Sequence, residues 1–276
     1  MNFGGGALGD DGDLSLQDES SIEAAAGATA TGADPDALVR SRVPRHLLAK
    51  YEMYSYRGAI VVLAEKWPGL FKELLEALDR FEISTAIIRK PGGNESEIPK
   101  LFSELLRPIG WHETVISGDL DVTLAWKQLV RQPNGKMRSE KKSRNILKRR
   151  FLDGHKIDYV KDGVAFDLEW NSKDQTFDRD LYAFNAFSLC GVIDAGVLVT
   201  RSDQLNEVFR KLGPALDLLG EVAKKPNGEP RMVYEKYGAS TTWMGKLLYR
   251  LNAGRNGSCP VLAIGIKPGC ISDWNA

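Results

Sequence analysis

Hydrophobic positions recur along the chain with two different periods, and each period predicts one kind of element. Apolar residues spaced three to four apart predict helices over residues 44–56, 68–81, 96–108, 176–190, 204–219 and 241–251. Continuous apolar runs at 196–200 and 260–266 are typical of strands covered on both faces. Shorter patterns predict strands at 114–116 and 121–126, around a turn at Gly118-Asp119. This mixture predicts a single α/β domain over residues 43–276, with a mixed sheet flanked by helices.

The clearest alternation lies in residues 157–170, where a turn at Asp162-Gly163 is expected to join two strands into a hairpin. The core face of the second strand consists of Val164, Phe166, Leu168 and Trp170. Side chains two apart on a strand point to the same face, so Asp167 and Glu169 project together on the opposite side. The hairpin brings Asp158 of the first strand beside them.

Three converging carboxylates are costly unless a cation is present, and carboxylate oxygens suit a hard divalent ion such as Mg²⁺. The pattern therefore indicates metal-assisted hydrolysis of phosphodiesters. Two alternatives remain open from the spacing. The acids fit the solvated face of a surface hairpin, and a carboxylate pair also fits a glycosidase, whose acid and base lie about 5–10 Å apart. The lack of a Trp/Asp-rich stretch and the basic flanking sequence disfavour the glycosidase.

The formal net charge of zero hides an uneven distribution. Residues 1–39 contain eight acids and no Lys or Arg, which leaves 37 basic and 29 acidic residues in 40–276, a net charge of +8. We expect residues 1–42 to be a disordered acidic tail, because they hold too few large apolar side chains to form a core. The basic remainder is consistent with a polyanionic partner.

Other compositional features point to the cell interior. The chain has no apolar run near the roughly 20 residues that span a bilayer, and its N-terminus does not resemble a signal peptide. The odd number of cysteines, without metal-ligand spacing, predicts reduced thiols in a cytoplasmic protein. These cysteines are Cys190, Cys259 and Cys270.

A basic stretch at residues 131–150, which includes Arg144, precedes the acidic hairpin. Such a stretch fits contacts with DNA phosphates, although a solvated surface explains it equally well. Sequence readout needs side chains at base edges. The candidates follow the second strand and precede the last helix, and they are Asn171, Ser172, Lys173, Ser240, Thr241, Thr242 and Lys246. Alternatively, Ser240-Thr-Thr caps that helix and Lys173 is plain surface charge.

The acids and their spacing resemble the PD-(D/E)XK nucleases. More narrowly, Gly154-His-Lys-Ile-Asp158, followed by Asp167-Leu-Glu-Trp-Asn-Ser172 and the residues up to Phe184, resembles the BglII/BstYI group of type II restriction endonucleases. The segment Tyr237-Gly-Ala-Ser-Thr-Thr-Trp-Met-Gly-Lys246 is also similar to that group. The resemblance extends over roughly residues 45–270.

This resemblance implies a restriction-endonuclease-like core and hydrolysis of double-stranded DNA with one or two Mg²⁺ ions. It implies metal ligation by Asp158, Asp167 and the backbone carbonyl of Leu168. Glu169 stands where many members of the superfamily have Lys, so it is a candidate general base or second metal ligand. A homodimer that cuts a short palindrome, and a cognate DNA methyltransferase, are also implied. The alternatives are another nuclease of the superfamily, for repair or junction cleavage, and a non-catalytic DNA-binding protein.

Overall fold

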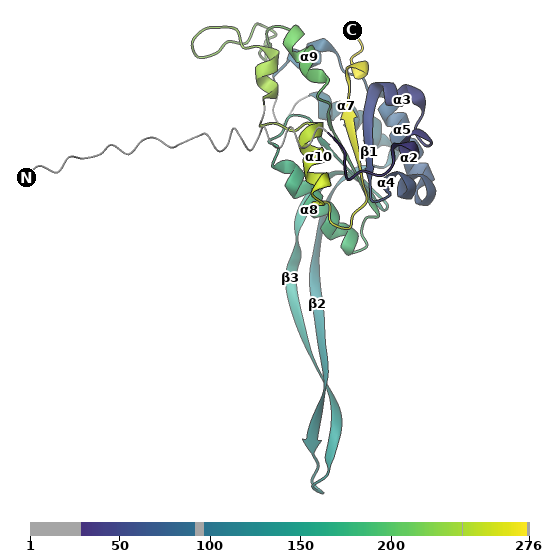
Figure 1. Ribbon diagram of the computed structural model, residues 1–276. Helices are drawn as coiled ribbons and strands as arrows, with labels where there is room; N and C mark the ends of the chain where they lie inside the picture. The colour runs from purple at the N-terminus through teal and green to yellow at the C-terminus, as the bar shows by residue number, and fades with distance from the viewer. Residues whose placement is uncertain (1–28, 92–96, 239, 275–276) are drawn as a thin grey trace, which may run out of the picture. The chain divides into compact units, whose positions relative to one another are not determined.

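The structure is a computed structural model that describes residues 29–91, 97–238 and 240–274 (Figure 1). Contacts divide the chain into two units. Unit 1 is formed by the chain up to His112 and from Asp158 onward, and unit 2 comprises Glu113–Ile157. Among the described residues, no helix has the length and apolar character needed to cross a membrane.

A mixed sheet organises unit 1. Its strands are β1 (Tyr51–Tyr56), β6 (Val261–Ile266), β5 (Ala195–Arg201), β4 (Val164–Glu169) and the end of β3 (Met137–Lys161), in the order β1-β6-β5-β4-β3. The inner strands β6, β5 and β4 run parallel, whereas β1 and β3 pair antiparallel with their neighbours. The predicted α/β class with a mixed sheet flanked by helices is confirmed.

Helices cover both faces of this sheet. One face packs into a large apolar core with α2 (Asp36–Arg40), α3 (Arg45–Lys50), α4 (Ala59–Val61), α5 (Pro68–Arg80), α6 (Thr85–Arg89), α7 (Glu97–Leu106) and α9 (Leu205–Lys211). The other face is covered by α8 (Thr176–Leu189) and α10 (Met244–Asn252). Helix α8 packs closely against β5, because a Cβ added to Gly196 of this strand would lie 2.3 Å from the ring of Phe184 on the helix. The side chains of Val164, Phe166 and Leu168 belong to the first face, so the alternating acids of β4 belong to the α8/α10 face.

Three predicted elements differ from the structure. The helix expected at 44–56 ends at Lys50, because the next six residues pair with β6 as strand β1. The helix expected at 204–219 ends at Lys211, since Gly213 has φ +71° and Pro214 follows it. The two short strands expected at 114–126 are one continuous strand, β2 (His112–Arg131).

Residues 29–42 of the expected tail belong to the folded unit. The Asp34 carboxylate accepts hydrogen bonds from the Ser55 hydroxyl at 2.6 Å and from the Gly58 backbone N–H at 2.8 Å. Val39 of α2 is 2% exposed. The expectation of disorder is therefore wrong for these residues, while residues 1–28 lie outside the described part of the chain.

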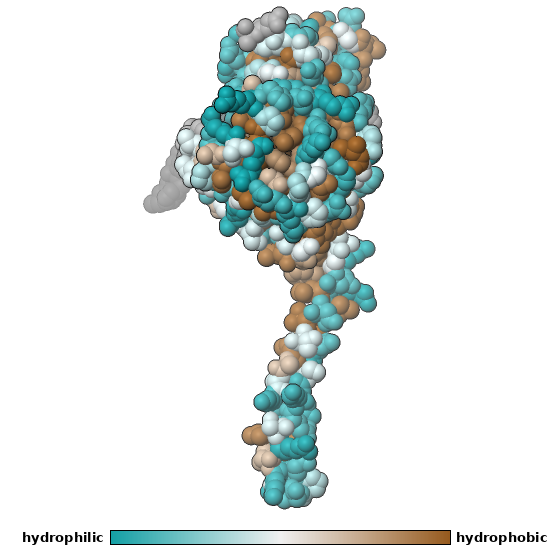
Figure 2. All heavy atoms as spheres, turned by 90° about the vertical axis from the view of Figure 1, so that its right-hand side faces the viewer, coloured by the Kyte–Doolittle hydropathy of each residue, from teal (hydrophilic) through white to brown (hydrophobic). Residues whose placement is uncertain are grey.

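Unit 2 is a β-ribbon, in which β2 and β3 are joined by a tight turn at residues 132–136. The turn is closed by a hydrogen bond from the Gln132 backbone N–H to the Lys136 carbonyl at 2.8 Å. Residues 113–157 contain eleven basic and five acidic residues, a net charge of +6. Most of the ribbon is exposed, and its surface is mainly hydrophilic near the turn, with hydrophobic side chains gathered in the other half (Figure 2). The basic stretch at 131–150 is thus mostly strand rather than loop or helix.

Candidate active site

The pairing of β3 with β4 brings two of the predicted acids together. Tyr159 is opposite Phe166, so the next pair along the ladder is Asp158 with Asp167. The Asp158 backbone N–H donates to Asp167 Oδ1 at 2.8 Å, and the Leu168 backbone N–H donates to Asp158 Oδ2 at 3.0 Å. These reciprocal bonds fix both carboxylates against the strand ends.

The acids of β4 are buried beneath α8 and α10. Asp167 is 4% exposed and Glu169 is 8% exposed, so they do not form the solvated face of a surface hairpin. Among the described residues, Asp167 Oδ2 and Glu169 Oε2 have no hydrogen-bond partner. A buried carboxylate oxygen without a partner carries a desolvation penalty, which a bound cation removes.

The electrostatics follow from this burial. Desolvation, followed by repulsion from Asp158, raises the pKa of Asp167 well above its usual range. Burial also raises the pKa of Glu169, although hydrogen bonds with Ser172 and Asp180 partly oppose the shift. Both carboxyl groups therefore favour a proton until a cation compensates their charge.

A fourth acid, which the sequence analysis missed, lies in the same place. Asp180 of α8 is 1% exposed, and one of its carboxylate oxygens lies within 4.8 Å of a carboxylate oxygen of Asp167. Burial, followed by the charges of Asp167 and Glu169, raises the pKa of Asp180 to about 9. The sequence did carry a signal: Asp180 sits three residues after Phe177 and four before Phe184, on the apolar stripe of the helix.

These side chains fit a hard divalent cation. The donors are carboxylate oxygens, which Mg²⁺ prefers, and the β4 acids offer Asp167 Oδ2 and Glu169 Oε2, which are buried without a hydrogen-bond partner among the described residues. Leu168 lies between the two β4 acids, where its main-chain carbonyl was predicted to serve as a ligand. The arrangement can hold a cation next to a group that accepts a proton, as hydrolysis of a phosphodiester requires.

Two segments predicted to contact DNA lie side by side. The Thr242 backbone N–H donates to the Ser172 carbonyl at 2.9 Å, and the Asp174 N–H donates to the Ser240 carbonyl at 3.1 Å. An antiparallel bridge joins Lys173 to Thr241. The chain thus brings residues 171–174, directly after the acids, against residues 240–242.

The side chains of this pair of segments differ in exposure. Lys173 and Ser240 are exposed, whereas Thr242 is buried, and Thr241 accepts a hydrogen bond from Arg201 and donates one to the Gly238 carbonyl at 2.7 Å. Asn171 lines a cavity of about 540 Å³ together with Arg231 and Lys236. The N-cap of α10 is Trp243, so the alternative in which Ser240-Thr-Thr caps the helix is not realised.

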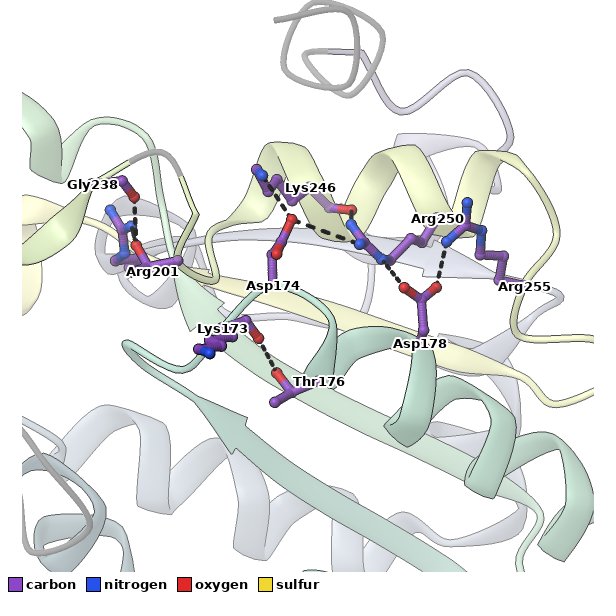
Figure 3. Close-up of polar contacts among 10 residues, drawn as sticks. Lys173, Asp174, Thr176, Asp178, Arg201, Gly238, Lys246, Arg250 and Arg255 are labelled. Atoms are coloured by element: carbon purple, nitrogen blue, oxygen red, sulfur yellow. Dashed lines mark hydrogen bonds and ion pairs between the residues drawn. The ribbon is translucent and has the colours of Figure 1, made fainter. Parts of the chain in front are cut away.

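Lys246 lies inside the protein and not at a surface open to DNA. Its ammonium group donates to Asp174 at 2.7 Å, and the side chain is 4% exposed (Figure 3). Arg250 lies 3.7 Å from Asp174 and donates to Asp178 at 3.0 Å, and Arg255 also contacts Asp178. These pairs fasten the start of α8 to α10. The predicted contact of Lys246 with a base edge is therefore not supported, whereas Arg144 lies exposed on the ribbon.

The sequence matches the model of a known protein family. The family described as restriction endonuclease BglII/BglIII matches residues 51–266. The matched region begins at the first residue of β1 and ends at the last residue of β6, so it includes the whole sheet of unit 1. A search of curated proteins finds no match.

Proposed function

We propose, because the chain belongs to the BglII/BglIII family of restriction endonucleases, that it is a type II enzyme that cleaves DNA at a short palindromic site with Mg²⁺. The family makes the chain a DNA hydrolase, and the finer assignment is our own. The observation that carries it is the convergence of Asp158, Asp167 and Glu169, in which Asp167 Oδ2 and Glu169 Oε2 are buried without a hydrogen-bond partner among the described residues.

Each acid has a proposed task. Asp158 and Asp167, fixed by their reciprocal hydrogen bonds, would hold the cation together with the Leu168 carbonyl. A bound Mg²⁺ lowers the pKa of water and stabilises negative charge on the phosphate. Glu169 takes the proton of the attacking water or serves as a second ligand, and burial raises the pKa of this carboxyl, which makes it a better proton acceptor. If Glu169 accepts the proton, one Mg²⁺ ion is sufficient, whereas its role as a ligand would allow a second ion to bind.

The DNA contacts divide between the two units. We assign the phosphate contacts to the ribbon, because it carries a net charge of +6 and its basic side chains, including Arg144, are exposed. We assign base contacts to Asn171, Ser172 and Lys173 together with Ser240 and Thr241. The buried Thr242 supports this segment through its backbone.

A palindromic site is read by a symmetric protein, so we propose a homodimer. A nuclease of this kind also needs a DNA methyltransferase that protects the host genome, and the two would act in the cytoplasm. Another nuclease of the same superfamily, for repair or junction cleavage, would use the same acids but cut without sequence preference. A non-catalytic DNA-binding protein would not need a buried acid cluster.

Digestion of methylation-free genomic DNA, followed by sequencing of the ends, tests this proposal. We expect discrete ends in Mg²⁺ that define the site and the overhang, and no cleavage in EDTA. Asp158→Ala and Asp167→Ala should abolish cleavage, while Glu207→Gln on the exposed surface of α9 should leave it unchanged. Random ends would overturn the restriction function, and full activity of both Ala variants would overturn the assigned site.

A further inference from the structure

Helix α8 places a cation directly against the buried acids. Arg179 Nε and Nη2 lie 3.2 and 3.1 Å from Asp180 Oδ1, and Nη2 lies 3.8 Å from Glu169 Oε1. The guanidinium group thus spans a carboxylate of α8 and a carboxylate of β4. The Arg179 side chain is 59% exposed, so the group that is held by buried acids also reaches the surface of the site.

The anchor of this arginine is rigid. Asp180 is 1% exposed and lies on the apolar stripe of α8, and the chain at the start of this helix is tied to α10 by the ion pairs of Asp174 and Asp178. A guanidinium has five N–H donors in a fixed plane, and the contacts with the acids use Nε and Nη2. Nη1 makes no hydrogen bond to any residue that the structure describes, so its donors remain for a ligand.

The chemistry of the proposed reaction calls for such a donor. A phosphodiester that approaches Asp158, Asp167 and Glu169 meets like charge, and its own negative charge grows as the water attacks. One divalent ion does not neutralise three carboxylates and a phosphate. A pre-positioned guanidinium stabilises phosphate oxygens through short charge-assisted hydrogen bonds, and in other systems the loss of one such donor lowers the rate by about 10²–10³.

We propose that Arg179 is a further catalytic residue, whose guanidinium contacts the phosphate that is cleaved, and that Asp180 is the positioning residue that holds it. This inference rests on the proposed nuclease function. Glu169 stands at the place where a cation was expected from the resemblance, and Arg179 supplies positive charge beside that same carboxylate. The alternative is that Arg179 only compensates the buried charge of Asp180.

Variants of the full-length protein separate these roles, with a plasmid that the wild type cleaves as the probe. We expect Arg179→Met to lower the single-turnover cleavage rate about 10²–10³-fold. Plasmid binding in Ca²⁺ should change only slightly, and thermal stabilisation by Mg²⁺ should persist or increase because a competing cation is gone. Arg179→Lys should restore only part of the rate, since an ammonium cannot span both carboxylates. Arg210→Met, on the exposed face of α9, is the matched control.

Asp180→Asn tests the positioning role. We expect a loss of rate close to that of Arg179→Met, no further loss in the double variant, and retained stabilisation by Mg²⁺. Wild-type cleavage by Arg179→Met would overturn the inference, and so would loss of Mg²⁺ stabilisation in Asp180→Asn, which would make Asp180 a metal ligand. If the wild type itself cuts no DNA, the proposed function fails instead, so the two failures are distinguishable.

Discussion

Strand β3 contributes to two regions of opposite charge, and the comparison shows how burial decides what a charge does. At its end, Asp158 joins Asp167 and Glu169 in a buried cluster whose carboxyl groups have raised pKa values. Along the ribbon, basic residues such as Lys141 and Arg144 are exposed, and water screens them from one another. The buried carboxylates therefore destabilise the folded protein until a cation binds to them. The exposed basic residues can bind a polyanion and hardly affect the stability of the fold.

The largest expected effect tests the buried side of this comparison. Asp167→Asn removes a proposed ligand and one of the repelling charges, so cleavage should fall by at least about 10³-fold, or roughly 4 kcal/mol. Stabilisation by Mg²⁺ in a thermal unfolding assay should disappear, while stability in EDTA at neutral pH should rise. If the variant were less stable than the wild type in EDTA, burial of the Asp167 carboxylate would not destabilise the folded protein. Glu207→Gln serves as the control.

A second test concerns buried basic side chains, whose charge must be compensated by an acidic partner, as the charge of the buried acids must be compensated by a cation. Among the described residues, Lys246→Met leaves Arg250 as the ion-pair partner of Asp174, and loss of one member of a buried ion pair costs about 3 kcal/mol. The free energy of unfolding in urea should fall by about this amount, and adding Asp174→Asn should recover part of it. Lys72→Met removes the exposed pair with Glu76 and should cost at most about 0.5 kcal/mol. Equal effects of the two Lys variants would remove the distinction between buried and exposed pairs.

The pH dependence of stability without metal sharpens the comparison further. The pKa values of Asp167, Glu169 and Asp180 in the folded protein lie above those of the unfolded chain, and that of Asp180 rises to about 9. The folded state therefore binds more protons, and this contribution is fully present below about pH 4 and is lost as the pH rises towards 9. In EDTA we expect the unfolding free energy to fall by on the order of 2 kcal/mol between pH 5 and 9.

Asp180→Asn supplies the control for that measurement. Urea titrations at several pH values should give a flatter profile for this variant than for the wild type. Saturating Mg²⁺ should also suppress the decline. A wild-type profile that rises with pH in EDTA would contradict the raised pKa values.

The smallest expected effect lies on the exposed side. Replacing Lys141, Lys142 and Arg144 with Gln should weaken plasmid binding in Ca²⁺ about tenfold and reduce the salt slope by up to about 3. Unfolding should not change, because these side chains are exposed. An equal loss on replacing Lys72, Arg80 and Arg210 of unit 1 would show that general charge, and not the ribbon, binds DNA.

The acidic hairpin was predictable because its information is local. An apolar residue at every second position and the Asp162-Gly163 turn fix the strands, and the register then brings Asp158 to Asp167. The burial of the acids was not predictable, because it depends on α8 and α10, and α10 is distant in sequence. Asp180 was missed because only the apolar residues of the α8 pattern were considered, although its position on the apolar stripe marks it as buried.

Strand β1 and the ribbon were misjudged for different physical reasons. The residues from Tyr51 to Tyr56 follow α3 without a Gly or Pro break, and only pairing with β6 selects the strand. The ribbon has few buried side chains, so little hydrophobic alternation reports its two strands. Lys246 was assigned to DNA because a sequence does not show that Asp174 lies against its ammonium group.

The backbone bridge between residues 171–174 and 240–242 has a consequence for how this protein can acquire a new target. Because Lys173 and Thr241 are partners in one short ladder, a change of length or conformation in either segment displaces the other. The segments must therefore diverge together during evolution. An engineer who transplants recognition from a relative should exchange residues 171–173 and 240–242 together, and retain the ion pair between Asp174 and Lys246.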